Sequence, residues 1–347
     1  MTQQYGSPQA ARIGRTKGAI LKHAIPKEVL GITGNQHKIG KNMSDTVVFR
    51  RWLPYGGADT NATTINQWDV DPTEHLTQEG VTPAADTIEA QDITVQLNQY
   101  ACLYKYTDKV LNLYEDDVPK AMKKQTGQRM GLVRELIRYG ALKGCTNKFY
   151  AGGTSRSAVD EAISLGKLRA VTRSITGNLG DLVSEVLTGS AKYNTAPVEA
   201  AFLVFAHTDC ENDIRELPGF VPCASYGTMS KVHACELGSC DRYRFILSPH
   251  LDPIADAGNS NAAAQGMIST TGTSCDVYPY IIVGEDAWGD VALRGSESFD
   301  ITDISPGQKD KIDPLGLIGY VGAKFWSAAF VQNDGWMAVL ECAATDL

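Results

Sequence analysis

The chain has 347 residues and a net charge of −8, with 43% hydrophobic and 21% charged residues. This composition is typical of globular proteins and excludes wholesale disorder. No run of 18 or more apolar residues could cross a membrane, and the first 18 residues lack the apolar run of a secretory signal. We therefore expect the protein to act in the cytoplasm where it is made.

Residues 1–45 are rich in Gly, Gln, Lys and Arg without periodicity, which predicts an extended arm. Residues 1–50 contain eight Lys and Arg residues against two acidic residues, a net charge of +6 that leaves −14 on the remainder. A basic arm on an acidic body suggests contact with a polyanion or an acidic partner, although a solvated tail is an equal alternative. The arm has no interleaved aromatic pattern, so sequence-specific nucleic-acid reading is not expected. Its candidate contact residues are Arg12, Arg15, Lys17 and Lys22.

Two strand-like segments flank a long polar stretch. Residues 46–56 are β-branched and aromatic and end at Gly56-Gly57, and residues 93–110 resume with alternating apolar residues. The stretch between them, residues 57–92, is rich in Thr, Asp and Pro. A structureless loop of this length is uncommon inside a compact domain. We expect a projecting β-hairpin that lies on a neighbouring molecule.

The strongest helix signal covers residues 116–150. Asp116 or Asp117 can cap its N-terminus, and Pro119 falls in the first turn, where a missing N–H costs nothing. Apolar residues recur at spacings of three and four, so a single helix would extend about 50 Å. Such a helix is typical of a spine that supports other parts of a fold. Two shorter helices broken near Thr126-Gly127 are the alternative.

The middle and second half of the chain combine one further helix with β-strands. A shorter helix is expected over residues 160–174. Residues 200–207 form a continuous apolar run typical of a buried strand, and residues 242–251 and 277–293 also favour strands. Residues 255–274 have few large apolar side chains and predict an exposed loop.

The C-terminal region predicts a meander. The apolar segment 317–332 is followed by Asn333-Asp334-Gly335 and a second apolar segment. Asp-Gly between two apolar strands is a strong signal for a β-hairpin, so we expect these strands to pair.

The sequence contains none of the common catalytic, phosphate-binding or calcium-binding motifs, and we assign no catalytic, cofactor or metal residue. The eight cysteines form no CxxC pair and are expected as buried thiols. One group of His and Cys residues has the ligand types that zinc requires, but its spacings fit no known finger. A thiol enzyme would also need an activating partner that the spacing does not reveal. The group is His207, Cys210, Cys223, His233, Cys235 and Cys240.

Four segments in the second half resemble, in order, the major capsid family of N-four-type podoviruses. They are LVFAHTDCENDIRELPGFVPCASYG (203–227), GSCDRYRFILSPH (238–250), VYPYIIVGEDAWGDVAL (277–293) and DPLGLIGYVGAKFWSAAFVQNDGWMAVLE (313–341). The last segment is the most specific. Its matching residues are Asp313, Pro314, Leu315, Gly322, Lys324, Asn333, Asp334, Trp336 and Met337.

The resemblance implies an α+β protein with the Hong Kong 97-type fold of tailed-bacteriophage capsids. It implies five parts: an N-terminal arm (1–45), an extended loop with its flanking strands (46–110), a peripheral domain with a spine helix (111–195), an axial domain (196–312), and C-terminal strands that return to the peripheral domain (313–347).

The implied function is that of a major capsid protein and not an enzyme. It would assemble in the bacterial cytoplasm into hexamers and pentamers of an icosahedral head that encloses the genome, and so become part of the virion. The implied partners are further copies of the chain, scaffolding protein, portal, decoration proteins and, non-specifically, packaged double-stranded DNA, with no cofactor and no membrane. The basic arm would face the interior. An encapsulin-type shell, another virion protein such as a tail component, and a zinc or thiol enzyme are the alternatives.

Overall fold

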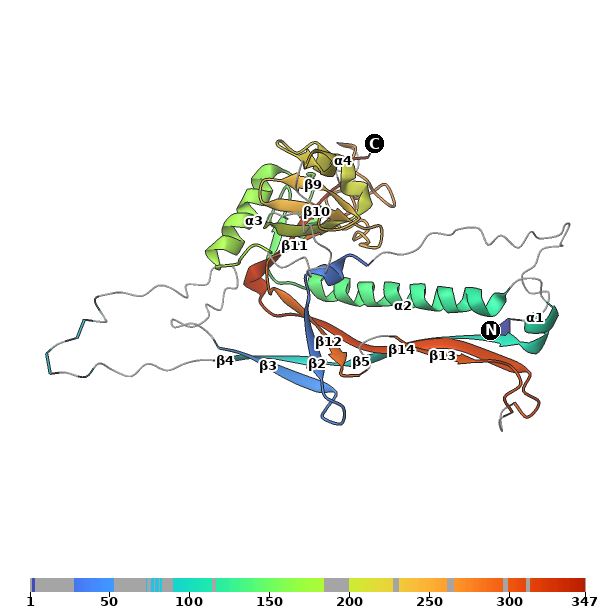
Figure 1. Cartoon of the computed structure of the whole chain (residues 1–347). Helices are drawn as coiled ribbons and strands as arrows, with labels where there is room; N and C mark the ends of the chain where they lie inside the picture. The colour runs from blue at the N-terminus through green and yellow to red at the C-terminus, as the bar shows by residue number, and fades with distance from the viewer. Residues whose placement is uncertain are drawn as a thin grey trace.

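The computed structural model describes residues 2–3, 28–52, 73, 76–77, 79–80, 82, 90–113, 117–183, 200–226, 231–260, 265–295, 299–309 and 313–346. Figure 1 shows an elongated body with a long helix lying along a sheet, a hairpin projecting from one end, and a second lobe stacked on the body. In the described residues, no helix is long and apolar enough to span a membrane.

The two strand-like segments of the first half pair as an antiparallel hairpin. Strand β3 (Thr46–Trp52) lies against β4 (Ala90–Gln96), from the pair Thr46 and Gln96 to the pair Trp52 and Ala90. The paired strands of the expected hairpin are thus present. Most of the polar stretch between them lies outside the described residues.

A six-stranded sheet forms the base of the body. The order of its strands is β1-β5-β14-β12-β2, with β13 paired to β14. Residues 35–39, within the segment expected as an extended arm, form strand β2 of this sheet, which runs parallel to β12. The bounds are β1 (Thr2–Gln3), β2 (Asn35–Ile39), β5 (Asn98–Thr107), β12 (Trp288–Leu293), β13 (Asp300–Ile304) and β14 (Ile318–Val331).

The spine helix α2 (Val118–Lys143) follows the short helix α1 (Asp108–Leu113). The Asp117 carboxylate accepts a hydrogen bond from the Lys120 amide at 3.1 Å, which confirms the predicted cap. The helix is unbroken at Thr126, so the two-helix alternative is wrong. It ends at Lys143, earlier than predicted, with Gly144 as the C-terminal cap, and is about 39 Å long. The residues beyond it form strand β6 (Lys148–Tyr150) instead of further helix.

One face of the six-stranded sheet packs against α2. Alternate residues of β5, among them Tyr104 and Tyr106, join Met122 of the helix in a buried cluster, and Met130 packs on Phe325 of β14 in another. The intervening β5 residues are exposed on the opposite face. Because strand side chains alternate, the period of two in β5 and the helical period in α2 produce a two-layer core.

The second lobe is built on a seven-stranded sheet in the order β6-β15-β11-β7-β10-β9-β8. Strands β7, β10, β11 and β15 are buried along their whole lengths. Helix α3 (Leu165–Gly177) covers this core with Leu168, Val171 and Ile175, close to the predicted 160–174. The remaining bounds are β7 (Phe202–Ala206), α4 (Glu211–Arg215), β8 (Val221–Pro222), β9 (Glu236–Cys240), β10 (Tyr243–Leu247), β11 (Tyr278–Val283) and β15 (Met337–Cys342).

The strand prediction for segment 277–293 is confirmed, and the segment divides into β11 and β12, which lie in different sheets. Strands β14 and β15 also lie in different sheets. The predicted hairpin at Asn333-Asp334-Gly335 is therefore wrong, because a 3-10 turn (Asp334–Trp336) leads the chain from one sheet into the other. Both apolar segments found buried partners in a separate sheet, which outweighed the local turn preference.

The segment 255–274, expected as an exposed loop, is half-buried to exposed where it is described. The Asp276 carboxylate accepts hydrogen bonds from the Asp256 amide at 2.8 Å and the Thr270 amide at 3.1 Å. A buried carboxylate at the start of the next strand therefore holds this loop in place.

Candidate assembly surfaces and the junction between the sheets

The two sheets are joined by two crossing segments that run side by side, residues 284–287 and 332–336. The Gly284 amide donates to the Trp336 carbonyl at 3.0 Å, and the Gln332 amide donates to the Ala287 carbonyl at 2.9 Å. A Cβ atom at Gly284 would lie 2.8 Å from the Trp336 carbonyl oxygen, so only glycine allows this approach. We call these two segments the junction.

Part of the family-matching terminal block stabilises the junction. The Trp336 indole donates to the carbonyl of Asn178, after α3, at 3.1 Å. The Asp334 carboxylate accepts from the Thr146 amide, after α2, at 3.3 Å. Thus the turn is tied to both helices. The block residues at or beside the junction are Asn333, Asp334, Trp336 and Met337.

The rest of the terminal block lies elsewhere, so the block does not form one site. Gly322 and Lys324 are in β14, where a Cβ at Gly322 would lie 2.8 Å from the Cys102 carbonyl oxygen of β5. The Asp313 carboxylate accepts from the Ile318 amide at 2.7 Å and shapes the turn before β14. Pro314 and Leu315 are exposed in that turn. These matches therefore reflect several separate structural requirements.

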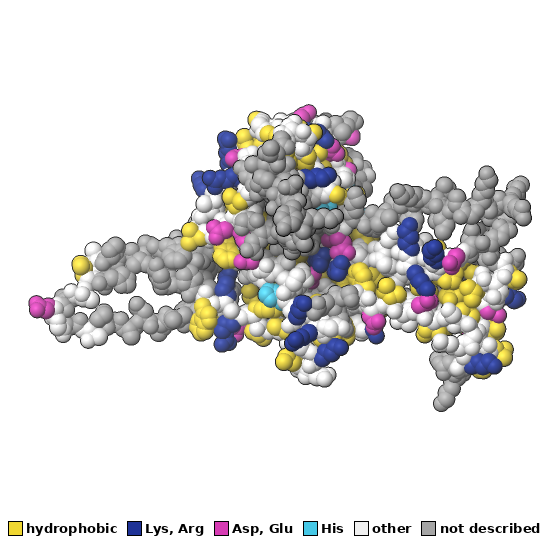
Figure 2. Space-filling model, viewed as in Figure 1, with side chains coloured by type: hydrophobic (Ala, Val, Ile, Leu, Met, Phe, Trp, Pro, Cys, Tyr) yellow, Lys and Arg dark blue, Asp and Glu magenta, His cyan; other side chains and the backbone are white. Residues whose placement is uncertain are grey.

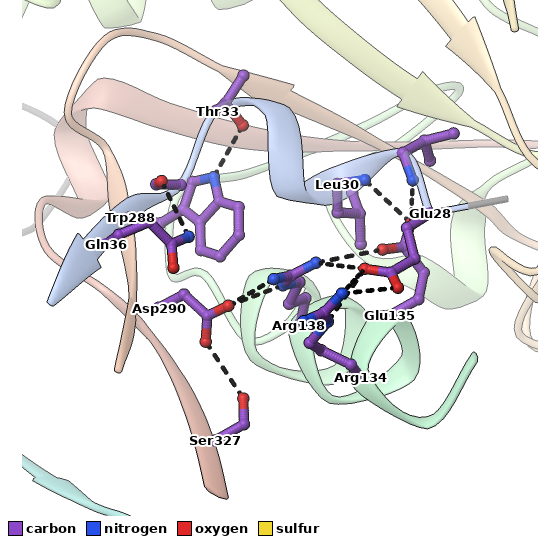
Figure 3. A network of polar contacts seen from close by, with 12 residues as sticks. Glu28, Leu30, Thr33, Gln36, Arg134, Glu135, Arg138, Trp288, Asp290 and Ser327 are labelled. Carbon is purple, nitrogen blue, oxygen red and sulfur yellow. Dashed lines mark hydrogen bonds and ion pairs between the residues drawn. The ribbon is translucent and has the colours of Figure 1, made fainter. Parts of the chain in front are cut away.

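A network of charged side chains ties the N-terminal segment to α2 and to the base sheet (Figure 3). The Arg138 side chain, only 6% exposed, donates to Asp290 of β12 at 2.6 and 3.0 Å and to Glu28 at 3.1 Å. Arg134, one turn earlier, also binds Glu28, at 2.8 to 3.0 Å. The Ser327 hydroxyl of β14 donates to the second Asp290 oxygen at 3.2 Å.

Glu135 holds the segment that follows Glu28. One oxygen of its buried carboxylate accepts hydrogen bonds from the Val29 and Leu30 amides, both at 2.9 Å. Burial raises the pKa of Glu135, and the two backbone hydrogen bonds and the charge of Arg138 partly offset this effect. The described segment that begins at Glu28 is thereby held against α2.

The projecting hairpin is also attached to the body at its root. The Phe49 ring of β3 stacks on Phe330 of β14 with centroids 4.6 Å apart, and the His37 ring of β2 lies 4.9 Å from Phe49. Across the hairpin, Arg50 binds Asp92 through two hydrogen bonds of 2.7 and 2.9 Å. Aromatic packing thus sets the direction in which the hairpin projects.

The opposite end of the body exposes a group of apolar side chains, visible around α1 in Figure 2. Leu315 is 72% exposed, and the Asp108 amide at the start of α1 donates to the Leu317 carbonyl at 2.9 Å, which brings these segments together. Clustered exposed apolar residues mark contact surfaces. We call this group, consisting of Leu111, Leu113, Leu315 and Leu317, the distal apolar surface.

The His and Cys residues do not form a metal site in the part of the chain that the structure describes. The Cys223 thiol lies 3.2 Å from the Glu236 carbonyl oxygen, and His233 accepts a hydrogen bond from the Cys235 amide. Burial raises the pKa of Cys145 and Cys210 to about 12, so these thiols are neutral. This chemistry suits core packing and not nucleophilic catalysis.

The predicted basic arm residues Arg12, Arg15, Lys17 and Lys22 lie outside the described residues. A basic surface that sequence reasoning missed lies on α2, where Figure 2 shows Lys and Arg side chains gathered. Lys120, Lys124 and Arg129 are exposed there, whereas Glu135, the only acidic residue of the helix, is buried. The helical periodicity together with the absence of other acidic residues could have revealed this face.

Comparisons with known proteins agree with this architecture. The chain is 19% identical over 268 residues to the major capsid protein of Pseudomonas phage KPP21, an alignment covering 72% of this chain and 67% of that protein. Its structure resembles the capsid of Ralstonia phage GP4, with a TM-score of 0.67 and 12% identity, over 98% of this chain and 97% of the other. It also resembles the capsid of cyanophage Pam1, with a TM-score of 0.59 and 11% identity over 99% and 98%. No family model matches the chain.

The fold is the α+β, Hong Kong 97-type fold of tailed-phage capsid proteins. The sequence relative and the fold lead to the same class, and the chain is a phage major capsid protein, a structural protein and not an enzyme. Neither the encapsulin-type nor the enzymatic alternative receives support. The finer N-four-type assignment stays a prediction.

Proposed function

We propose that the chain assembles, in the host cytoplasm, into hexamers and pentamers of the icosahedral head that encloses double-stranded DNA. The observation that supports this most is the agreement in fold with the GP4 capsid, which covers 98% of this chain. The base with α2 then acts as the peripheral domain, and the lobe on the seven-stranded sheet acts as the axial domain facing the capsomer centre.

The contact that joins neighbouring subunits is proposed to be electrostatic at the hairpin. Residues 53–91 contain seven Asp and Glu residues and no Lys or Arg. Helix α2 exposes Lys120 and Lys124, which are one turn apart, and Arg129 farther along the helix. A shell needs contacts between two different surfaces of the same subunit, and these two surfaces have opposite charge. The hairpin of one copy is proposed to lie on α2 of the next.

The distal apolar surface supplies a second contact in this proposal. Its leucines lie at the end of the body opposite the hairpin (Figure 1), where a further copy can cover them. Burial of apolar area contributes about 25 cal/mol per Å² of surface removed from water. Charge complementarity would then orient the subunits, and apolar burial would stabilise the assembled contact.

The basic arm is proposed to face the interior. Arg134 and Arg138 bind Glu28, the first described residue after the basic segment. Arg12, Arg15, Lys17 and Lys22 would meet an acidic scaffolding protein before packaging and genome phosphates after it. A portal and decoration proteins complete the proposed partners. Deletion of residues 1–25 should reduce the yield of closed shells, and a normal yield would contradict the role of the arm.

Electron microscopy of the expressed chain, alone and with the products of neighbouring genes, tests the assembly proposal. Closed icosahedral particles composed of hexamers and pentamers are expected. A soluble monomer under both conditions, with bound zinc, would contradict it.

Charge reversal tests the hairpin contact separately. The triple variant Lys120→Glu, Lys124→Glu and Arg129→Glu should prevent shell formation, because the acidic hairpin would meet a face of like charge. The matched control, Lys120→Arg with Lys124→Arg, retains the positive charge of α2 and should assemble. Normal shells from the triple variant would contradict the proposed contact while leaving the shell function intact.

A further inference from the structure

A cavity of about 530 Å³ lies between the hairpin root and the junction. The hairpin contributes Phe49, Arg51 and Trp52 to its wall, and the junction contributes Trp336. Leu179, which follows α3, closes another side and is held with a φ of 57°, an unusual conformation for a branched residue. The cavity is within the size range of small-molecule sites, and its aromatic walls are typical of them.

Arg51 is the unusual polar group of this wall. Its terminal nitrogen donates to the Gln91 side chain at 2.7 Å, but its Nε atom is buried and has no hydrogen-bond partner among the described residues. Its neighbour Arg50 has a carboxylate partner, Asp92, and is exposed. Burial lowers the pKa of Arg51, and the charge of Asp334 only partly opposes this effect.

Buried donors without acceptors are uncommon in folded proteins and often mark a site for a missing partner. A carboxylate is the best acceptor for a guanidinium, because it forms short, charge-assisted hydrogen bonds. The cavity's own carboxylate, Asp286, accepts a hydrogen bond from Asn35 of β2 at 2.7 Å. The carboxylate of a ligand can therefore bind at Arg51, on the wall formed by the hairpin.

We propose that this cavity binds a small apolar carboxylate, a molecule with one aromatic or branched aliphatic group and one carboxylate. The carboxylate accepts from Arg51 Nε, and the apolar group lies among Phe49, Trp52 and Trp336. Such a ligand contacts the hairpin and the junction together, and so couples the direction of the hairpin to the arrangement of the two sheets. The site is separate from the α2 face and the distal apolar surface of the proposed shell contacts.

Titration of the unassembled full-length subunit with 3-phenylpropionate, followed by calorimetry and ligand-observed NMR, tests the proposal. The uncharged isostere 3-phenylpropionamide is the matched ligand control. We expect the carboxylate to bind at least tenfold more tightly than the amide. Equal affinities, or no binding of the carboxylate at 10 mM, would overturn the proposal; this threshold corresponds to a binding free energy of about −3 kcal/mol.

Two variants locate the site. Arg51→Met should weaken binding of the carboxylate to the level of the amide. Arg215→Met, at an exposed arginine of α4 that pairs with Glu211 outside the cavity wall, should leave it unchanged. Trp52 is 63% exposed, so Trp52→Ala is expected to fold, and it should weaken both ligands to a similar degree. Unchanged affinity in Arg51→Met or in Trp52→Ala would overturn the assignment.

The assembled shell provides the last measurement. Binding of 3-phenylpropionate to closed shells at the affinity of the subunit supports a small-molecule site. Binding that disappears on assembly would mean that a neighbouring copy fills the cavity, and would overturn the assignment to a small ligand.

Discussion

Replacement of Glu135 by alanine should release the N-terminal segment from the spine helix, whereas replacement by glutamine should not. One carboxylate oxygen of Glu135 accepts both the Val29 and the Leu30 amide hydrogens at 2.9 Å. Both of these residues are fully buried, so neither amide can turn to water when the acceptor is removed. Alanine deletes the acceptor, and glutamine keeps an oxygen in the same place.

The expected size of the effect follows from the two orphaned donors. A buried donor left without an acceptor costs about 1–3 kcal/mol, so Glu135→Ala should destabilise the docked segment by about 2–6 kcal/mol. Burial raises the pKa of Glu135, which means that an uncharged group is tolerated at this position. The stability of the docked segment in Glu135→Gln should therefore stay within about 1 kcal/mol of that in the parent protein. The main loss is the ion pair with Arg138, whose nitrogen lies 4.0 Å from the Glu135 carboxylate.

Amide hydrogen exchange measures this local opening directly. In Glu135→Ala, the peptide containing Val29 and Leu30 should exchange at least about 30-fold faster, since about 1.4 kcal/mol corresponds to a factor of ten. In Glu135→Gln its exchange should stay close to that of the parent. Unchanged protection in the alanine variant would refute the reasoning that this carboxylate anchors the arm. Equal losses in both variants would instead assign the effect to charge.

Three further predictions concern the same body of the protein. Asp290→Ala should destabilise the subunit by about 3–5 kcal/mol in urea unfolding because it leaves Arg138 buried without its closest carboxylate, and adding Arg138→Met should recover part of the loss. Gly322→Ala should cost about 1–3 kcal/mol in the same assay, since its methyl would lie 2.8 Å from a carbonyl oxygen of the adjacent strand; the exposed helical control Gly140→Ala should gain up to about 1 kcal/mol. Burial raises the folded-state pKa of Glu135 above its unfolded value, so protection of the amides that it binds, corrected for intrinsic exchange, should increase as pH falls through the folded pKa. Glu135→Gln should lack this pH dependence; a similar dependence in both proteins would assign it to another group.

The buried network fixes the segment that directly follows the basic residues of the N-terminus. Glu28 is the first described residue after the basic segment, and two arginines of α2 hold it. In the proposed shell, the direction in which the arm leaves the body decides which partner it reaches. Breaking one member leaves a buried charge unpaired, so the network favours a single arrangement of the segment at Glu28, the spine helix and the base sheet.

The sequence predicted several of the helices and strands from residues that are close together in the chain. The Asp117 cap with Pro119 in the first turn predicted the start of α2, and the apolar run 200–207 predicted the buried strand β7. The polar stretch between β3 and β4 predicted a hairpin. These features depend on residues close together in the chain, where side-chain period and capping act directly. The resemblance of the second half to the capsid family then supplied the fold class, because four matching segments occur in the same order along the chain.

Pairing between distant segments was decided only by the tertiary structure. Segment 277–293 reads as one apolar unit, yet its halves enter different sheets, and the Asp334-Gly335 turn connects strands that do not pair. Arg138 and Asp290 are 152 residues apart, and nothing in their local context links them. A strand or buried charge selects its partner by competition among all available surfaces when the chain is compact. The sequence by itself therefore determined the elements and the capsid class, and the three-dimensional packing determined the junction, the charged network and the cavity.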